Sequence, residues 1–257
     1  MTHASPETAA TEAPADLSAF VESERRRADV VGVSYAAFNR DGVAYAGAFG
    51  HADLDRGERV TTDTRFRAAS ISKLFTTTLV FQEIEAGRIG LDDSVNRHLD
   101  EPARLRRKGG GDADDVTIRH LLTHTSGLPV SWRGIEYDRR LYTAIANESL
   151  RTFSDLSTLV AGQRTVRPPG RRLVYSNGAF NLLGYLVQRL NGEPFADLVH
   201  DRVLAPLGMH SSGFPAEAGG PGVATPYGGV MTGAGRKPAP KVRNHSGPAG
   251  ALITTAN

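Results

Sequence analysis

The 257-residue chain contains no cysteine. That absence excludes disulfide bonds, a thiol nucleophile and any metal site built on thiolate ligands. The chain also lacks an apolar run approaching the roughly 18 residues that a membrane-spanning helix needs. Residues 1–16 are rich in Ala, Thr, Glu and Pro, without the basic and apolar regions of a secretion signal. We therefore predict a disordered tail at 1–16, one domain at 17–257, no membrane partner and a cytoplasmic location.

An excess of charge of either sign is nearly absent, because 30 Lys and Arg residues face 28 Asp and Glu residues. The net charge of +2 is too small to indicate a polyanionic partner, although the sequence pI is near 9.0. The basic runs at 25–27 and 104–108 are short and are typical of a solvated surface. We expect no nucleic-acid partner.

The hydrophobic pattern predicts both helices and strands. An amphipathic helix is predicted at 17–27, and strand-like runs at 30–38 and 43–49 flank an Asp-Gly turn, which predicts a hairpin. Residues 71–86 are apolar on nearly every side and predict a buried central helix that ends at Gly87. Further predictions are helices at 117–124, 150–162, 178–190 and 194–204, loops at 109–115 and 215–240, and a buried strand at 250–255.

The first candidate for chemistry is the pair Ser70 and Lys73. Their i, i+3 spacing brings a hydroxyl and an amine to one face of a helix, where the amine can take the serine proton. Lysine occupies only positions 73, 108, 237 and 241, yet one lysine lies in the most apolar helix. Burial favours the neutral amine, which a base requires and a guanidinium cannot supply. The alternative is an N-cap serine beside a lysine that reaches the surface.

A second candidate group is Tyr175-Ser176-Asn177, which follows Pro168-Pro169-Gly170 and precedes a helical pattern. A phenol near a cation can share its proton, and a side-chain amide can orient a substrate carbonyl. The alternative is structural, with Asn177 as an N-cap and Tyr175 as a half-buried aromatic residue.

Other catalytic and metal-binding motifs find little support. His120 and His124 have the spacing of zinc-protease histidines, but Leu121 stands where such sites need a glutamate, so structural histidines are favoured. The Gly-x-Ser-x-Gly nucleophile elbow and the Walker loop are both absent.

The order of these segments resembles the serine β-lactamase-related family, in the branch of class C β-lactamases, D-alanyl-D-alanine carboxypeptidases and family VIII esterases. The resemblance covers residues 17–257. It is carried by FRAASISK at 66–73, GRIGLDD at 87–93, TIRHLLTHTSGLP at 117–129, YSN at 175–177 and PLGM at 206–209. It implies an α+β fold of the β-lactamase/transpeptidase-like type, in which a helical lobe packs against an antiparallel sheet.

The resemblance also implies a mechanism and its residues. Ser70 attacks a carbonyl to form an acyl-enzyme, Lys73 and Tyr175 relay protons, and Asn177 contacts the substrate. The backbone N–H of Ser70 forms half of the oxyanion hole. No metal or organic cofactor is expected, and the partner is a small ester or amide.

The departure from the family pattern is a third motif, Lys-Thr-Gly or a variant with histidine, which lies on a later strand in the family. No segment after Asn257 can supply it, so we expect a chain truncated at its C-terminus, with an incomplete sheet and cleft. The leading hypothesis is a serine hydrolase acting on an ester, a β-lactam or a D-amino-acid peptide. The alternative is a catalytically silent binding or assembly protein that keeps the fold.

Overall fold

Two compact units make up the chain, each assembled from segments that are distant in sequence. In the computed structural model, the first comprises residues 1–67, 219–240 and 254–257, and the second comprises residues 68–218 and 241–253. The structure describes residues 11–12, 14–101, 103–129, 156–215, 221–227 and 247–256. All four candidate residues, Ser70, Lys73, Tyr175 and Asn177, belong to the second unit.

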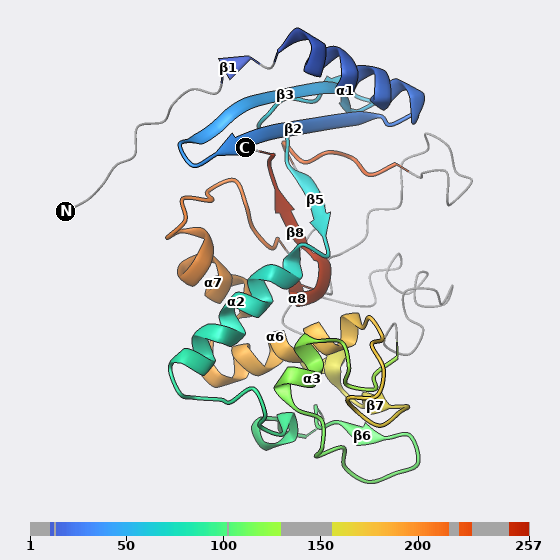
Figure 1. The fold of residues 1–257 in the computed structure, drawn as a ribbon, viewed down its shortest axis with the longest axis vertical. Coiled ribbons are helices and arrows are strands. Elements are labelled where there is room, and N and C mark those ends of the chain that lie inside the picture. Colours follow the sequence, from blue (N-terminus) through green and yellow to red (C-terminus); the bar gives the residue numbers. More distant parts are fainter. Residues whose placement is uncertain are drawn as a thin grey trace, which may run out of the picture. The chain divides into compact units, whose positions relative to one another are not determined.

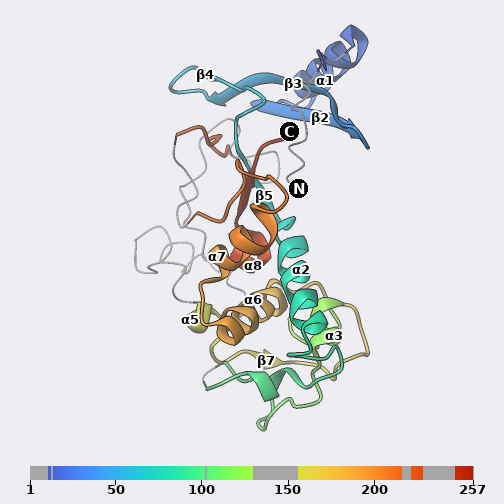
Figure 2. The same cartoon turned by 90° about the vertical axis from the view of Figure 1, so that its left-hand side faces the viewer.

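A twisted antiparallel hairpin forms the centre of the first unit (Figures 1 and 2). Its strands are β2 (Gly32–Asn39) and β3 (Gly42–Asp53), and β1 (Thr11–Glu12) and β4 (Glu58–Arg59) both pair with β3. Asn39 pairs with Gly42, whose φ of +125° favours glycine, so the predicted hairpin is confirmed. Helix α1 (Ala15–Arg27), also predicted, is tied to β2 by a 3.1 Å hydrogen bond between Ser18 Oγ and Tyr35 Oη.

The helices of the second unit surround α6 (Asn177–Asn191), of which ten consecutive residues, 178–187, are buried. Gly192, just beyond the helix predicted at 178–190, ends α6 in a left-handed conformation at φ +69°. The other helical elements are α2 (Ser72–Glu85), the 3-10 turn η1 (Val95–His98), α3 (Ile118–Leu122), α5 (Leu156–Val160), α7 (Phe195–Val199), the π-helical turn η4 (His200–Leu204) and α8 (Gly247–Gly250). The part of the helix predicted at 150–162 that precedes residue 156 lies outside the described residues.

Helix α2 is only partly buried, and the prediction of a helix covered on every side is wrong. Its inner side includes Phe75, Leu79 and Val80, which are buried in the core. Leu74 and Phe81, on the opposite side, are 67% and 47% exposed. An apolar side chain in a sequence does not by itself require a partner, because folded proteins leave much apolar surface in contact with water.

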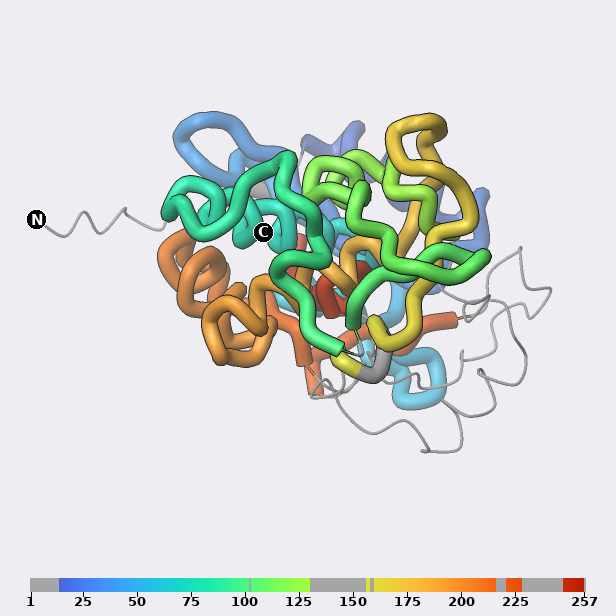
Figure 3. The backbone as a smooth tube through the Cα atoms, turned by 90° about the horizontal axis from the view of Figure 1, so that it is seen from below, coloured from blue at the N-terminus to red at the C-terminus, as the bar shows by residue number. Residues whose placement is uncertain are grey.

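Short strands lie wholly or partly in the second unit. β5 (Phe66–Ala69) pairs with β8 (Leu252–Thr254), and β8 confirms the strand predicted at 250–255. β6 (Arg106–Arg107) pairs in parallel with β7 (Arg164–Thr165), and Figure 3 shows these green and yellow segments from below. The largest fully buried side chains all lie in this unit and include Leu79, Leu105, Ile118, Leu121, Leu182, Leu186, Phe195 and Leu204. Each contributes about 1.5–3 kcal/mol through burial of apolar surface.

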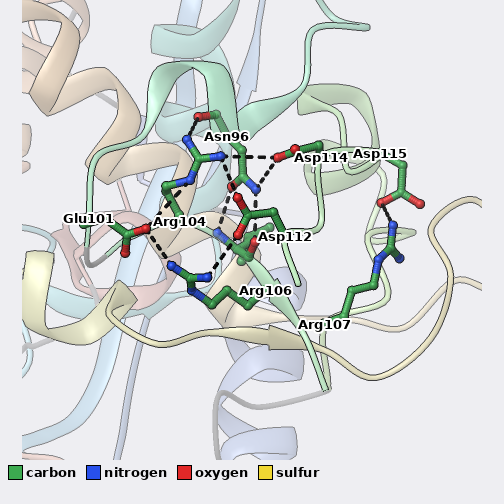
Figure 4. A network of polar contacts seen from close by, with 9 residues as sticks. Asn96, Glu101, Arg104, Arg106, Arg107, Asp112, Asp114 and Asp115 are labelled. Atoms are coloured by element: carbon green, nitrogen blue, oxygen red, sulfur yellow. Dashed lines mark hydrogen bonds and ion pairs between the residues drawn. The ribbon is translucent and has the colours of Figure 1, made fainter. Parts of the chain in front are cut away.

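The basic run at 104–108 is neutralised by acidic residues around it. Ion pairs join Arg104 to Asp112 (3.0 Å), Arg106 to Asp112 (3.1 Å) and Glu101 (2.7 Å), and Arg107 to Asp115 (2.9 Å) (Figure 4). The loop predicted at 109–115 is therefore tied back to the strand that precedes it. The arginines of the run at 104–107 are thus paired within the chain.

The described residues contain no helix that is both long enough and apolar enough to cross a membrane.

Candidate active site

Ser70 lies in the tight turn that joins β5 to α2, and it is exposed. Ala69, directly before it, has a φ of +45°, which is strained for a residue with a Cβ. The buried hydroxyl of Ser72 holds this turn, because it donates to the carbonyl of Ala69 (2.7 Å) and accepts the backbone N–H of Leu252 on β8 (2.9 Å). Ser72 thus fixes Ser70 against β8, a role that its place in the sequence did not indicate.

Lys73 Nζ lies within hydrogen-bond distance of three oxygens. They are Ser70 Oγ at 3.1 Å, Asn177 Oδ1 at 2.8 Å and the carbonyl of Ala249 at 2.7 Å. The amide oxygen of Asn177 and the carbonyl oxygen of Ala249 can only accept, so each takes one N–H of Lys73 Nζ. The third substituent position of Nζ then faces Ser70 Oγ. In the amine form that position is a lone pair, which is the geometry required to take the Ser70 proton. The residue is 7% exposed, as predicted for a buried lysine.

The hydroxyl of Tyr175 is the other group on Ser70 Oγ, to which it donates at 2.8 Å. Lys73 Nζ lies 4.7 Å from the centre of the Tyr175 ring, within the range of a cation–π interaction. Tyr175 is 41% exposed. Tyr175 therefore lies between Ser70 and solvent. A group that donates a proton to a leaving group has to lie in such a position.

Asn177 is the first residue of α6 and directs its side chain toward Lys73. The N-cap of α6 is Ser176, whose hydroxyl accepts the backbone N–H of Ala179 at 3.3 Å. The alternative in which Asn177 caps the helix is therefore wrong, because Ser176 already fills that position.

His120 and His124 do not share a helix face. His120 completes a capping box at the start of α3, where its Nδ1 accepts the backbone N–H of Thr117 at 3.2 Å. His124 lies beyond the end of α3 with a φ of +57°. Nowhere in the described ranges do three or more His, Cys, Asp or Glu residues form a group that could hold a metal ion.

Sequence reasoning missed α8, which orients the amine of Lys73. The carbonyls of Pro248 and Ala249 accept hydrogen bonds from Thr76 Oγ1 (2.7 Å) and Lys73 Nζ (2.7 Å), so consecutive carbonyls of α8 bind one face of α2. A backbone carbonyl has no side-chain signature, and 176 residues separate Lys73 from Ala249. No spacing rule could have found this contact.

Replacement of Gly184 by alanine tests how tightly α8 is held. A Cβ at Gly184 on α6 would lie 2.1 Å from Pro248 Cγ, so the Gly184→Ala variant must displace α8 and the Ala249 carbonyl. We expect a loss of about 1–3 kcal/mol in the free energy of unfolding, measured in urea. The double variant Gly184→Ala/Pro248→Gly removes the clashing ring and should recover part of the loss. Equal stability of the single variant and the unmodified protein would contradict this account.

A serine hydroxyl in contact with a buried amine and a phenol is one arrangement in which a neighbouring base can activate serine as a nucleophile. The Beta-lactamase family model matches residues 17–257. The chain is 34% identical to penicillin-binding protein 4 of Amycolatopsis lactamdurans over 231 residues and 33% identical to esterase EstB of Burkholderia gladioli over 210 residues. These matches cover 88% and 78% of this chain, and 57% and 51% of the relatives.

Among solved structures, the octameric penicillin-binding protein homologue from Pyrococcus abyssi is similar, with a TM-score of 0.74 and 26% identity. That match covers 94% of this chain and 53% of the other. The chain belongs to the Beta-lactamase family and has its β-lactamase/transpeptidase-like fold. It spans about half the length of each of these three proteins.

Proposed function

We propose that the chain is a serine hydrolase that acts on an ester or an amide through an acyl-enzyme at Ser70. The observation that carries the proposal is the third position of Lys73 Nζ, which its other two partners direct at Ser70 Oγ. Membership of the Beta-lactamase family supports it, as do relatives named as an esterase and as a penicillin-binding protein.

The first chemical step is the attack of Ser70 Oγ on the substrate carbonyl carbon. As the O–C bond forms, the Ser70 proton moves to Lys73 Nζ. The Ser70 backbone N–H, close to the N-terminus of α2, supplies one donor to the oxyanion that develops. When the tetrahedral intermediate collapses, the C–O or C–N bond breaks and the leaving group takes a proton through the Tyr175 hydroxyl. Water then attacks the acyl carbon, releases the acid and restores Ser70.

The test is covalent labelling of the protein and of the Ser70→Ala variant with a fluorophosphonate and with a fluorescent penicillin, followed by intact-mass measurement. We expect one adduct on the unmodified protein and none on Ser70→Ala. The Ser23→Ala variant, which removes an exposed serine of α1, should be labelled normally. If no adduct depends on Ser70, the hydrolase proposal fails and the silent binding protein is favoured. Rates with a p-nitrophenyl ester and a chromogenic cephalosporin then rank the substrate classes.

A further inference from the structure

His124 holds the segment that carries Tyr175 from both sides. Its carbonyl accepts the backbone N–H of Val174 at 2.8 Å, and its Nδ1 accepts the backbone N–H of Ser176 at 3.1 Å. Between these two hydrogen bonds, the imidazole ring lies against the ring of Tyr175, with centroids 4.5 Å apart. The residue before Tyr175, the residue after it and its own side chain therefore all contact His124.

These contacts require a neutral imidazole. The Ser176 N–H is a donor, so Nδ1 must present its lone pair and the ring proton must lie on Nε2. Protonation of Nδ1 would set two donors against each other and place a second cation near Lys73. Burial first, and then the charge of Lys73, lower the pKa of His124 from its ordinary value of 6.5, so the neutral form prevails at pH 7.

The surroundings of the ring come from three parts of the second unit. Lys73 on α2 is the charged group that acts on it, Tyr175 is the titratable group in contact, and Phe180 on α6 packs at 5.1 Å between centroids. The backbone of His124 has a φ of +57°, where glycine would be free of strain. A glycine at position 124 would relieve this strain, but it would lose the Nδ1 acceptor and the ring that contacts Tyr175. The histidine keeps both contacts at the cost of the strain.

We propose that His124 is a positioning residue that sets the Tyr175 hydroxyl on Ser70 Oγ, through its Nδ1 acceptor and its stacked ring. This inference rests on the proposed function, in which Tyr175 delivers the proton. His124 touches neither Ser70 nor the reacting carbonyl in this mechanism, and it acts only through Tyr175.

The test is a double-mutant cycle with His124→Phe and Tyr175→Phe, in which the rate of acylation of Ser70 is measured. Phenylalanine keeps the ring and removes the acceptor, and we expect it to lower the acylation rate by about 10²-fold with little change in KM. When Tyr175 is already replaced by phenylalanine, adding His124→Phe should change the acylation rate by no more than about twofold. His124→Asn, which tolerates positive φ and offers an acceptor, should recover part of the rate. Equal losses in both backgrounds would show a merely structural role and overturn the proposal.

A measurement that needs no substrate separates this inference from the proposed function. Imidazole ¹⁵N chemical shifts should show His124 neutral at pH 7, with the proton on Nε2. A proton on Nδ1 would overturn the positioning role even if Ser70 were acylated. Conversely, failure of the unmodified protein to label would overturn the hydrolase proposal, and with it the role of His124 in acylation, whatever the tautomer.

Discussion

The Lys73→Met variant should acylate Ser70 about 10²- to 10⁴-fold more slowly than the unmodified protein, because the Ser70 hydroxyl loses its base. Methionine matches the length of the lysine stem and suits a site that is 7% exposed. The measurement is the rate at which the fluorophosphonate adduct accumulates, followed by intact mass.

Stability must be measured on the same variant, because the buried Ala249 carbonyl loses the Lys73 donor. A buried acceptor left without its donor costs about 1–3 kcal/mol. The Lys108→Met variant changes an exposed lysine and should label at the normal rate. A folded Lys73→Met protein that labels within tenfold of the unmodified rate would show that another group is the base.

The Glu83→Ala variant should lose about 3 kcal/mol of unfolding free energy, the lower end of the cost of breaking a buried ion pair. Glu83 on α2 is fully buried and accepts hydrogen bonds from Arg88, from Arg202 Nη1 (2.8 Å) and from Asn191 Nδ2 (3.0 Å). It thus ties α2 to the end of α6 and to η4. We expect the lower end of that range because the side chains of Arg88 and Arg202 are 43% and 30% exposed, so water can solvate them once the carboxylate is removed.

The same carboxylate makes stability depend on pH. Burial alone would raise its pKa, but the hydrogen bonds from Arg88, Asn191 and Arg202 outweigh burial and lower the pKa from 4.5. A lowered folded-state pKa stabilises the protein above the unfolded value and loses that contribution as pH falls through the folded one. Urea unfolding should therefore show a smaller loss of stability below pH 4.5 in Glu83→Gln than in the unmodified protein.

The matched control for Glu83 is Glu85→Ala, an exposed change on the same helix. It should stay within about 0.5 kcal/mol of the unmodified protein. If Glu83→Ala and Glu85→Ala destabilise equally, the buried network does not hold these helices.

Local patterns predicted much of the fold. The β2–β3 turn, the helix that ends at Gly192 and the approach of Ser70 to Lys73 each depend on residues close in sequence, where turn and helix geometry decide the outcome. Ser176 shows the limit even locally, because only Asn177 was considered as the cap of α6 from the sequence, whereas the adjacent Ser176 fills that position. The contacts of Glu83 with Asn191 and Arg202 span 108 and 119 residues and depend on tertiary packing, which no periodicity encodes.

The Ala249 carbonyl has a consequence for the order in which the site forms during synthesis. Ser70, Lys73 and Tyr175 leave the ribosome before the acceptor that orients the lysine, because Ala249 follows Lys73 by 176 residues. Contacts that close so long a loop form late in folding. A nascent chain can thus carry the serine, the amine and the phenol while the amine is still unaligned, so reactivity should be acquired only after residue 249 has left the ribosome.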